Sequence, residues 1–264
     1  MGVIMETLSK AERRHEAIKD LLIKNDVYFI DDFCNTLNVS EATIRNDLTF
    51  LESQGKLRRI KGGALATISI LQDSVFSKRS VENIGEKQKI AKYVVDHIIT
   101  EGMRITLDSG STCLAIAEAI VDRKLKCSVI TNSFSASRVL AKIPQVDLYL
   151  AGGRYNRQND SFRDEQTTAS ISTMFSDIFF LSADGVDADS GITTFYNDES
   201  FIKFEMIKQA KKVVVVSDYS KIGKVGLKLL CNINKVARII VDDKIDEEEV
   251  LKFKQANIQI DIVK

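Results

Sequence analysis

The stretch from Leu37 to Ala64, LNVSEATIRNDLTFLESQGKLRRIKGGA, decides the fold of the N-terminal part of the chain. It opens with a short polar turn, continues as an amphipathic segment and closes in a basic ribbon. Ser40 is a good N-cap, because its hydroxyl can accept a hydrogen bond from a free N–H of the first helical turn, and Gly55 is a good C-terminal stop. The pattern therefore predicts a helix over about 41–53, followed by two short strands around a turn within 57–63.

The predicted helix has one apolar face and one hydrogen-bonding face. Ile44, Leu48 and Leu51 recur at i, i+4 and i+7 and would face a core. A shorter helix, predicted over about 31–37, precedes the turn. Two helices joined in this way are typical of a helix-turn-helix, whose second helix enters the major groove of DNA. The basic ribbon would then be a wing against the adjacent DNA backbone. We predict DNA contacts from Ser40, Ala42, Thr43, Arg45, Asn46, Thr49, Arg58, Arg59 and Lys61.

Two features of this segment allow an interpretation other than DNA contact. Asp47 is acidic and would repel phosphate, so we interpret it as a structural residue that pairs with an arginine of the wing. The cations, taken singly, could form nothing more than a solvated surface. The turn, the cap and the basic ribbon occur together in register, however, and this combination favours DNA binding. A helix over about 6–25 and a β-rich piece at 27–29 complete the predicted small domain.

The composition is that of an ordinary globular protein, with 264 residues, 44% hydrophobic, 28% charged and a net charge of zero. No apolar run approaches the roughly 20 residues of a membrane span, and the N-terminus lacks the apolar core of a signal peptide. We therefore expect a cytoplasmic protein, without a membrane partner, in which the four cysteines are reduced. Neither the cysteines nor the two histidines show a metal-binding spacing, so we expect no metal and no cofactor.

The pattern of apolar residues in the sequence changes after residue 85. An irregular connector over 65–85 is followed by helical patterns that alternate with short, β-branched apolar runs. This alternation predicts an α/β domain over 86–264, with a doubly wound parallel sheet, after the winged helix-turn-helix domain over 6–64. The predicted strands are 104–107, 128–131, 147–150, 178–181, 213–217, 238–241 and 258–263.

Polar clusters follow five of these strands, where ligands of doubly wound sheets bind. Small residues at a strand-to-helix turn, as in 108–112, let backbone N–H groups and the positive end of a helix approach an anion. Carboxylates and amides in the other clusters can bind hydroxyl groups. This combination fits a polyol phosphate.

The segment from Val39 to Ala64 closely resembles the winged helix-turn-helix signature of the DeoR family of bacterial transcription regulators. The family pattern is Ser, two residues, Thr, an aliphatic residue, Arg, a basic or polar residue and Asp-Leu. Asn46 stands where arginine is most usual in that pattern. The similarity continues to about residue 243. The matching residues here are Ser40, Thr43, Ile44, Arg45, Asp47 and Leu48, then Phe76, Arg79, Glu86, Lys87, Ile90 and Ala91.

The resemblance implies a C-terminal sensor domain with a fold akin to ribose-5-phosphate isomerase, which binds phosphorylated sugars. It implies a regulator, in most cases a repressor, of a carbohydrate-metabolism operon that acts as a homo-oligomer, either a dimer or a tetramer. Its partners would be an operator in double-stranded DNA and a sugar-phosphate effector. On this resemblance the effector would bind Asp108, Gly110, Ser111, Thr112, Thr131, Asn132, Gly153, Asp184, Lys203, Asp218 and Lys221.

Two other functions compete with a regulator. An aldose–ketose isomerase needs a carboxylate base and a cation, which Asp184 or Asp187 and Lys203 or Lys221 could supply. The chain lacks the lysine- and glycine-rich loop of the isomerases that this fold resembles, so we expect no enzyme. A winged module that binds protein, on an α/β scaffold, is the third reading. It predicts no salt-dependent DNA binding.

Overall fold

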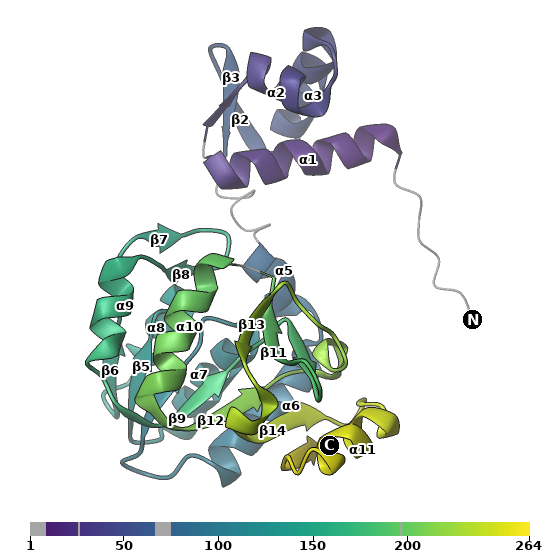
Figure 1. Cartoon of the computed structure of the whole chain (residues 1–264). Coiled ribbons are helices and arrows are strands. Elements are labelled where there is room, and N and C mark those ends of the chain that lie inside the picture. Colours follow the sequence, from purple (N-terminus) through teal and green to yellow (C-terminus); the bar gives the residue numbers. More distant parts are fainter. Residues whose placement is uncertain (1–8, 26, 67–74, 196) are drawn as a thin grey trace. The chain divides into compact units, whose positions relative to one another are not determined.

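The computed structural model of the chain describes residues 9–25, 27–66, 75–195 and 197–264 (Figure 1). The chain divides into two compact units, residues 1–78 and 79–264, and each is described by itself. The predicted start of the first helix at residue 6 lies outside the described residues.

The N-terminal unit is a winged helix-turn-helix. Its three-stranded antiparallel sheet has the order β1-β3-β2. The β-rich piece noted in the sequence is strand β1, which pairs with the wing. The elements are α1 (Lys10–Asn25), β1 (Val27–Phe29), α2 (Ile30–Leu37), α3 (Glu41–Ser53), β2 (Leu57–Ile60) and β3 (Gly63–Ala66).

Local chemistry explains both turns of this unit. Asn38 adopts the left-handed conformation between α2 and α3, and Ser40 Oγ accepts a hydrogen bond of 3.2 Å from the N–H of Thr43 at the start of α3. Gly62 has φ +81° in the turn between the wing strands. A Cβ on Gly63 would lie 2.4 Å from the carbonyl oxygen of Tyr28, so only glycine fits there.

The core of the N-terminal unit confirms the apolar face predicted for α3. Ile44, Leu48 and Leu51 are buried together with side chains of the other helices and the wing. Further buried members of this core are Ile18, Leu22, Ile30, Phe33, Leu57 and Ala64.

The connector is more regular than the sequence indicated. Strand β3 extends to Ala66, a short helix α5 spans Val75–Val81, and α6 already begins at Ile84. The expectation of an irregular segment over 65–85 is therefore wrong for its described residues. Seven residues with a single buried anchor, Phe76, are too few to give a clear helical period.

The C-terminal unit is built on a seven-stranded sheet whose neighbouring strands are all parallel, in the order β15-β14-β12-β9-β4-β5-β6. All seven predicted strands are present, with ends that shift by a few residues. They are β4 (Arg104–Leu107), β5 (Cys127–Thr131), β6 (Val146–Leu150), β9 (Ser176–Leu181), β12 (Ala210–Val216), β14 (Val236–Asp242) and β15 (Ile260–Val263).

Helices cover both faces of this sheet, as the doubly wound prediction requires. Alternate side chains of β9 enter opposite cores: Phe180 packs with α6, α7 and α8, whereas Phe179 packs with α9, α10 and α11. Helices α9 and α10 lie side by side (Figure 1). The helices are α6 (Ile84–His97), α7 (Ser111–Arg123), α8 (Phe134–Leu140), α9 (Glu165–Ser172), α10 (Asn197–Gln209) and α11 (Glu247–Gln255).

Two small antiparallel additions were not predicted. Strands β10 (Gly185–Asp187), β11 (Gly191–Thr194) and β13 (Lys228–Cys231) form a three-stranded sheet. Strands β7 (Tyr155–Asn156) and β8 (Ser161–Phe162) form a hairpin. Strands β7 and β8 have only two residues each, too few to show the alternation of a strand in the sequence.

Candidate functional sites

The polar face of α3 is open to solvent. Ala42, Arg45, Asn46 and Thr49 are exposed, and Thr43 is half-buried. The Arg45 guanidinium forms an ion pair with Glu41 one turn earlier. Both side chains are exposed, so this pair contributes little stability and can be exchanged for a phosphate or a base. Ser40 holds the helix start through its hydroxyl, which also contacts Thr43 Oγ1 at 2.8 Å.

The wing is fastened to α3 through Arg59. Its Nη1 donates to Thr49 Oγ1 at 2.6 Å, and its backbone N–H donates to Glu52 Oε1 at 2.7 Å. Arg58 and Lys61 of the same wing are exposed. The structure therefore brings the predicted recognition helix and the basic wing together on one surface.

Asp47 does not pair with the wing, and that prediction is wrong. Its carboxylate accepts hydrogen bonds from Arg14 Nε at 2.5 Å, Arg14 Nη2 at 2.9 Å and His15 Nε2 at 2.9 Å, all from α1. Burial alone would raise the pKa of Asp47, but the hydrogen bonds and charges of Arg14 and His15 outweigh burial and hold that pKa below its ordinary value. The His15 ring also stacks on Phe50, with ring centroids 4.9 Å apart. Helix α1 thus anchors the recognition helix from behind.

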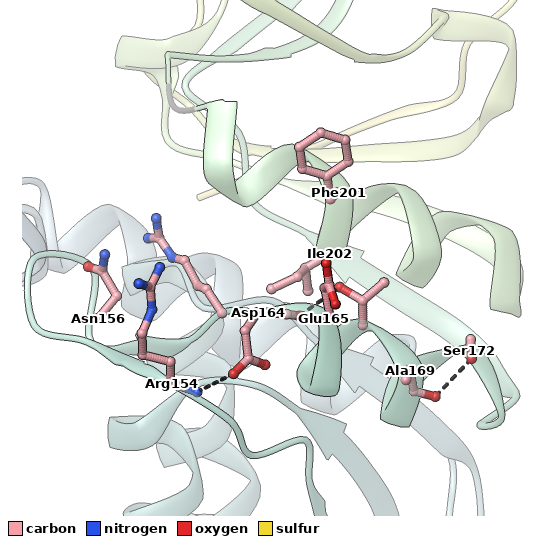
Figure 2. Close-up of a pocket in the computed structure, with 10 residues that line it drawn as sticks. Arg154, Asn156, Asp164, Glu165, Ala169, Ser172, Phe201 and Ile202 are labelled. Carbon is pink, nitrogen blue, oxygen red and sulfur yellow. Dashed lines mark hydrogen bonds between the residues drawn. The ribbon is translucent and has the colours of Figure 1, made fainter.

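In the C-terminal unit, a cavity of about 610 Å³ opens beside α9 (Figure 2). Arg154 and Arg163 bring two cations to it, and Asp164 and Glu165 bring two carboxylates. Asp164 caps α9 and accepts from the N–H of Thr167 at 2.8 Å. None of the predicted effector residues lines this cavity, although Arg154 directly follows one of them.

Gly153 serves that same helix cap. A Cβ on Gly153 would lie 2.3 Å from Thr167 Oγ1 and 2.4 Å from Asp164 Oδ1. Its φ of +148° also disfavours any other residue. The close approach to the cap explains the glycine without a ligand.

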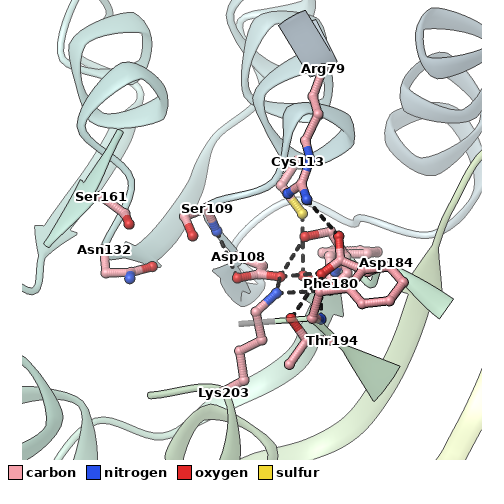
Figure 3. A network of polar contacts seen from close by, with 12 residues as sticks. Arg79, Asp108, Ser109, Cys113, Asn132, Ser161, Phe180, Asp184, Thr194 and Lys203 are labelled. Atoms are coloured by element: carbon pink, nitrogen blue, oxygen red, sulfur yellow. Dashed lines mark hydrogen bonds and ion pairs between the residues drawn. The ribbon is translucent and has the colours of Figure 1, made fainter. Parts of the chain in front are cut away.

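The main polar network lies at the switch point of the sheet (Figure 3). Strands β5 and β6 lie on one side of β4, and β9 lies on its other side, so the strand order reverses between β4 and β9. Doubly wound folds bind ligands in the crevice beyond the ends of the strands at such a point. Asp108, after β4, accepts from Lys203 Nζ at 2.5 Å, and Lys203 also donates to the carbonyl of Ser182, after β9, at 2.9 Å. Asp108 and Lys203 are both buried. Removing either partner would leave an uncompensated charge.

The turn after β4 has the features of an anion cradle. Helix α7 starts at Ser111, and Gly110, at its N-cap, offers no side chain to occupy the first-turn N–H groups. A Cβ on Gly110 would meet Ser182 Oγ at 2.1 Å, so the two turns are in direct contact. Ser111 is half-buried and Thr112 is buried. The turn therefore places uncapped backbone N–H groups and the positive end of the helix dipole next to the hydroxyl-bearing residues Ser111 and Thr112.

Asp184 lies after β9 and is nearly enclosed. It accepts from Arg79 Nη2 at 2.8 Å, Thr194 Oγ1 at 2.8 Å and the N–H of Phe195 at 3.0 Å. Burial would raise its pKa, but the charge of Arg79 and these hydrogen bonds keep the pKa below its ordinary value. Asp184 is therefore a carboxylate rather than a neutral acid.

Asp218 lies after β12 and is almost fully buried. Its Oδ1 accepts from Asn83 Nδ2 at 3.0 Å and from the N–H of Ser220 at 3.0 Å, and its Oδ2 lies 4.0 Å from Lys87 Nζ. Lys221 follows in a short 3₁₀ turn and is half-buried.

The end of β5 is tied to the β7–β8 hairpin. Asn132 Nδ2 donates to the carbonyl of Phe162 at 3.0 Å, while Asn132 Oδ1 is buried and has no hydrogen-bond partner among the described residues. Thr131 Oγ1 accepts from the N–H of Ser133.

Three partners at the switch point were not predicted from the sequence: Ser182, Asn83 and the contact of Arg79 with Asp184. Each of these residues is far along the chain from the carboxylate that it contacts.

Together, a winged helix-turn-helix and a doubly wound α/β unit with a polar switch point define a two-part DNA-binding transcription regulator. The chain belongs to the DeoR family: residues 14–69 match the DeoR-like helix-turn-helix domain, and residues 82–243 match the DeoR C terminal sensor domain.

Full-length relatives are similar over nearly the whole chain. A protein of Escherichia coli O157:H7, named provisionally as an aga operon transcriptional repressor, is 32% identical over 96% of this chain and 94% of its own. The transcriptional repressor AccR of Agrobacterium fabrum is 32% identical over 94% of this chain and 99% of its own. The HTH-type transcriptional regulator FruR of Bacillus subtilis is 31% identical over 90% of this chain and 96% of its own.

Among solved structures, a ribose 5-phosphate isomerase A from Methanocaldococcus jannaschii is similar at 24% sequence identity and a TM-score of 0.37, over 53% of this chain and 55% of that one.

In the described ranges of the chain, none of the helices combines the length and apolar character needed to cross a bilayer.

Proposed function

We propose that the chain represses a carbohydrate-metabolism operon, and that a phosphorylated sugar bound at the switch point of the sensor unit controls its DNA binding. The turn from Asp108 to Thr112 carries this proposal. It combines an uncapped N-terminus of a thirteen-residue helix with hydroxyl groups, beside a buried lysine–aspartate pair. Such a turn suits a phosphate, and the carboxylates that follow β9 and β12 suit sugar hydroxyls.

The DNA-binding half rests on the exposed front of α3 and the wing. Arg45 and Asn46 would meet base edges in the major groove, while Arg58, Arg59 and Lys61 would meet phosphates. A single recognition helix reads few base pairs, so we expect a dimer or tetramer that reads paired half-sites. Acting on a chromosomal operator, the protein would work in the cytoplasm.

Binding rather than turnover fits the two carboxylates that could serve as the base of an isomerase. Asp184 is engaged by Arg79, Thr194 and the backbone of Phe195, and Asp187 accepts from the N–H groups of Asp189 and Ser190. For Asp184 these donors stabilise the charged form, so this carboxylate is a poor base.

The test is fluorescence anisotropy of the full chain on labelled DNA from upstream of its own operon, at two salt concentrations. The panel would contain galactitol, tagatose, fructose, ribose, inositol and glycerol phosphates, each paired with its unphosphorylated counterpart. We expect salt-sensitive binding that one phosphate weakens and its counterpart does not. Absence of specific DNA binding, or turnover of a panel member, would overturn the proposal.

A matched variant separates the two halves of this function. Ser111→Asp places a negative charge at the mouth of the anion cradle, so it should abolish the phosphate response while operator affinity stays within about twofold of the parent. A normal response from this variant would remove the cradle from the effector site.

A further inference from the structure

The two carboxylates that follow β9 and β12 are engaged by residues of the connector. Arg79, in the last turn of α5, donates to Asp184 Oδ1 at 2.8 Å. Asn83, in the turn before α6, donates to Asp218 Oδ1 at 3.0 Å. The connector is thus bonded at both points to side chains predicted to bind the effector.

Lys87 contacts both the end of α5 and Asp218. Its Nζ donates to the carbonyl oxygens of Arg79 and Glu82 at 2.5 Å and lies 4.0 Å from Asp218 Oδ2. The lysine is buried, and burial lowers its pKa despite the neighbouring charge of Asp218. A buried ammonium group requires partners, so the end of α5, Lys87 and Asp218 form one bonded group.

Access to these carboxylates is restricted. Asp184 is 8% exposed and Asp218 is 2% exposed, and each oxygen that carries a connector contact is already an acceptor. A sugar hydroxyl that approaches Asp184 Oδ1 or Asp218 Oδ1 therefore competes with a donor that is already bound there. Arg79 is more readily displaced from Asp184 than Thr194 is, since the Arg79 side chain is 27% exposed whereas Thr194 is fully buried.

We propose that Arg79 and Asn83 are coupling residues, which compete with the hydroxyl groups of the effector for Asp184 and Asp218. This inference rests on the proposed function, in which the effector-bound repressor holds DNA weakly. The connector donors and the effector hydroxyl groups compete for the same oxygens, Asp184 Oδ1 and Asp218 Oδ1. The state with the connector bonded is therefore the one that binds the operator. Effector binding releases the connector, which leads along the chain to the wing.

Two substitutions test the coupling. Arg79→Ala removes the donor to Asp184. Asn83→Gly removes the donor to Asp218 and suits the backbone, because Asn83 has φ +49° and makes no side-chain cap for α6. The matched controls are Arg104→Ala, which removes an ion pair with Asp177 at the other end of the strands, and Asn257→Gly, at φ +58° after α11.

The measurement is operator affinity by anisotropy, in the absence of any sugar phosphate. We expect the Arg79→Ala and Asn83→Gly double variant to bind about tenfold more weakly than the wild type, a coupling of ordinary size, while the control double variant stays within about twofold. Thermal unfolding of each variant, monitored by circular dichroism, checks that the sensor unit remains folded.

The outcomes separate this inference from the function on which it rests. Specific operator binding by the wild type, with equal binding by the Arg79 and Asn83 double variant, would overturn the coupling alone. A wild type that binds no operator would overturn the proposed function and the coupling with it. Hydrogen exchange supplies a second readout, because loss of the connector contacts should speed exchange of the α5 amides and leave those of α7 unchanged.

Discussion

Arg59 of the wing donates a hydrogen bond of 2.6 Å from Nη1 to Oγ1 of Thr49 on α3, so two residues predicted as separate DNA contacts are bonded to each other. The same arginine is tied to Glu52 through its backbone N–H. Recognition helix and wing therefore present one continuous polar surface, and the position of the wing depends on the helix.

Arg59→Ala should weaken operator binding more than Arg58→Ala does. Arg58 is exposed and would contribute a phosphate contact only, so its loss should reduce the slope of log affinity against log salt by about one. Arg59 would contribute a similar contact and also hold the wing. Anisotropy titrations at several salt concentrations measure both effects. Equal losses for the two variants would show that the bond to Thr49 does not position the wing.

Arg45→Ala should cost about 1–3 kcal/mol of operator binding free energy, because a base-contacting arginine contributes on this scale. Its ion-pair partner offers a control: Glu41→Gln frees the guanidinium and should leave affinity equal or slightly higher. Isothermal titration with operator and with sugar phosphate measures the two sites separately. An unchanged operator affinity in Arg45→Ala would exclude it from the interface.

Asp47→Asn should destabilise the N-terminal unit by about 1–3 kcal/mol, because it weakens hydrogen bonds to Arg14 and His15 in a largely buried place. The Asp47 pKa is lowered on folding, so its contribution is fully present above the ordinary pKa of 3.8 and is lost as pH falls through the lowered folded value. Calorimetry of the full chain between pH 6 and 2 should therefore show a loss below about pH 4 that Asp47→Asn lacks. Parallel pH profiles for the two proteins would contradict this account.

Lys203→Met should destabilise the C-terminal unit by about 3–5 kcal/mol, because it leaves the buried Asp108 without its charged partner. Asp108→Asn alone should be costly for the same reason. The double variant should cost much less than the sum, since no buried charge remains. Urea unfolding followed by circular dichroism gives the cycle, and additive losses would mean that the two charges do not compensate each other.

Lys221→Ala should leave operator affinity unchanged and weaken the response to the sugar phosphate by roughly tenfold, since a half-buried lysine at an anion site contributes about one charge-assisted hydrogen bond. The exposed Lys235 provides a control, because Lys235→Ala removes the same charge from another loop. A response that both variants retain in full would remove Lys221 from the effector site.

Local patterns allowed much of the fold to be predicted. The cap at Ser40, the apolar spacing of Ile44, Leu48 and Leu51, and the β-branched runs of the sheet all act over a few residues, and each is visible in a single sequence. The helix over 41–53 and the seven strands were therefore located correctly.

Partners across the chain were not predictable in this way. Asp47 finds Arg14 at a separation of 33 residues, and Asp184 finds Arg79 at 105. Which side chain becomes the partner of each carboxylate depends on how the helices pack, and a local sequence period does not reveal this packing. The same limit applies to Ser182, whose hydroxyl reaches back to Asp108 across 74 residues.

The recognition helix separates its two tasks on opposite sides. Asp47 faces α1, where it is bonded to Arg14 and His15. The neighbouring Asn46 and Arg45 are exposed and are not part of the buried core. Under the proposed function, substitutions on the outward side would therefore redirect the regulator to a new operator without weakening its fold. Duplicated copies of such a gene could diverge in target while inheriting the same scaffold.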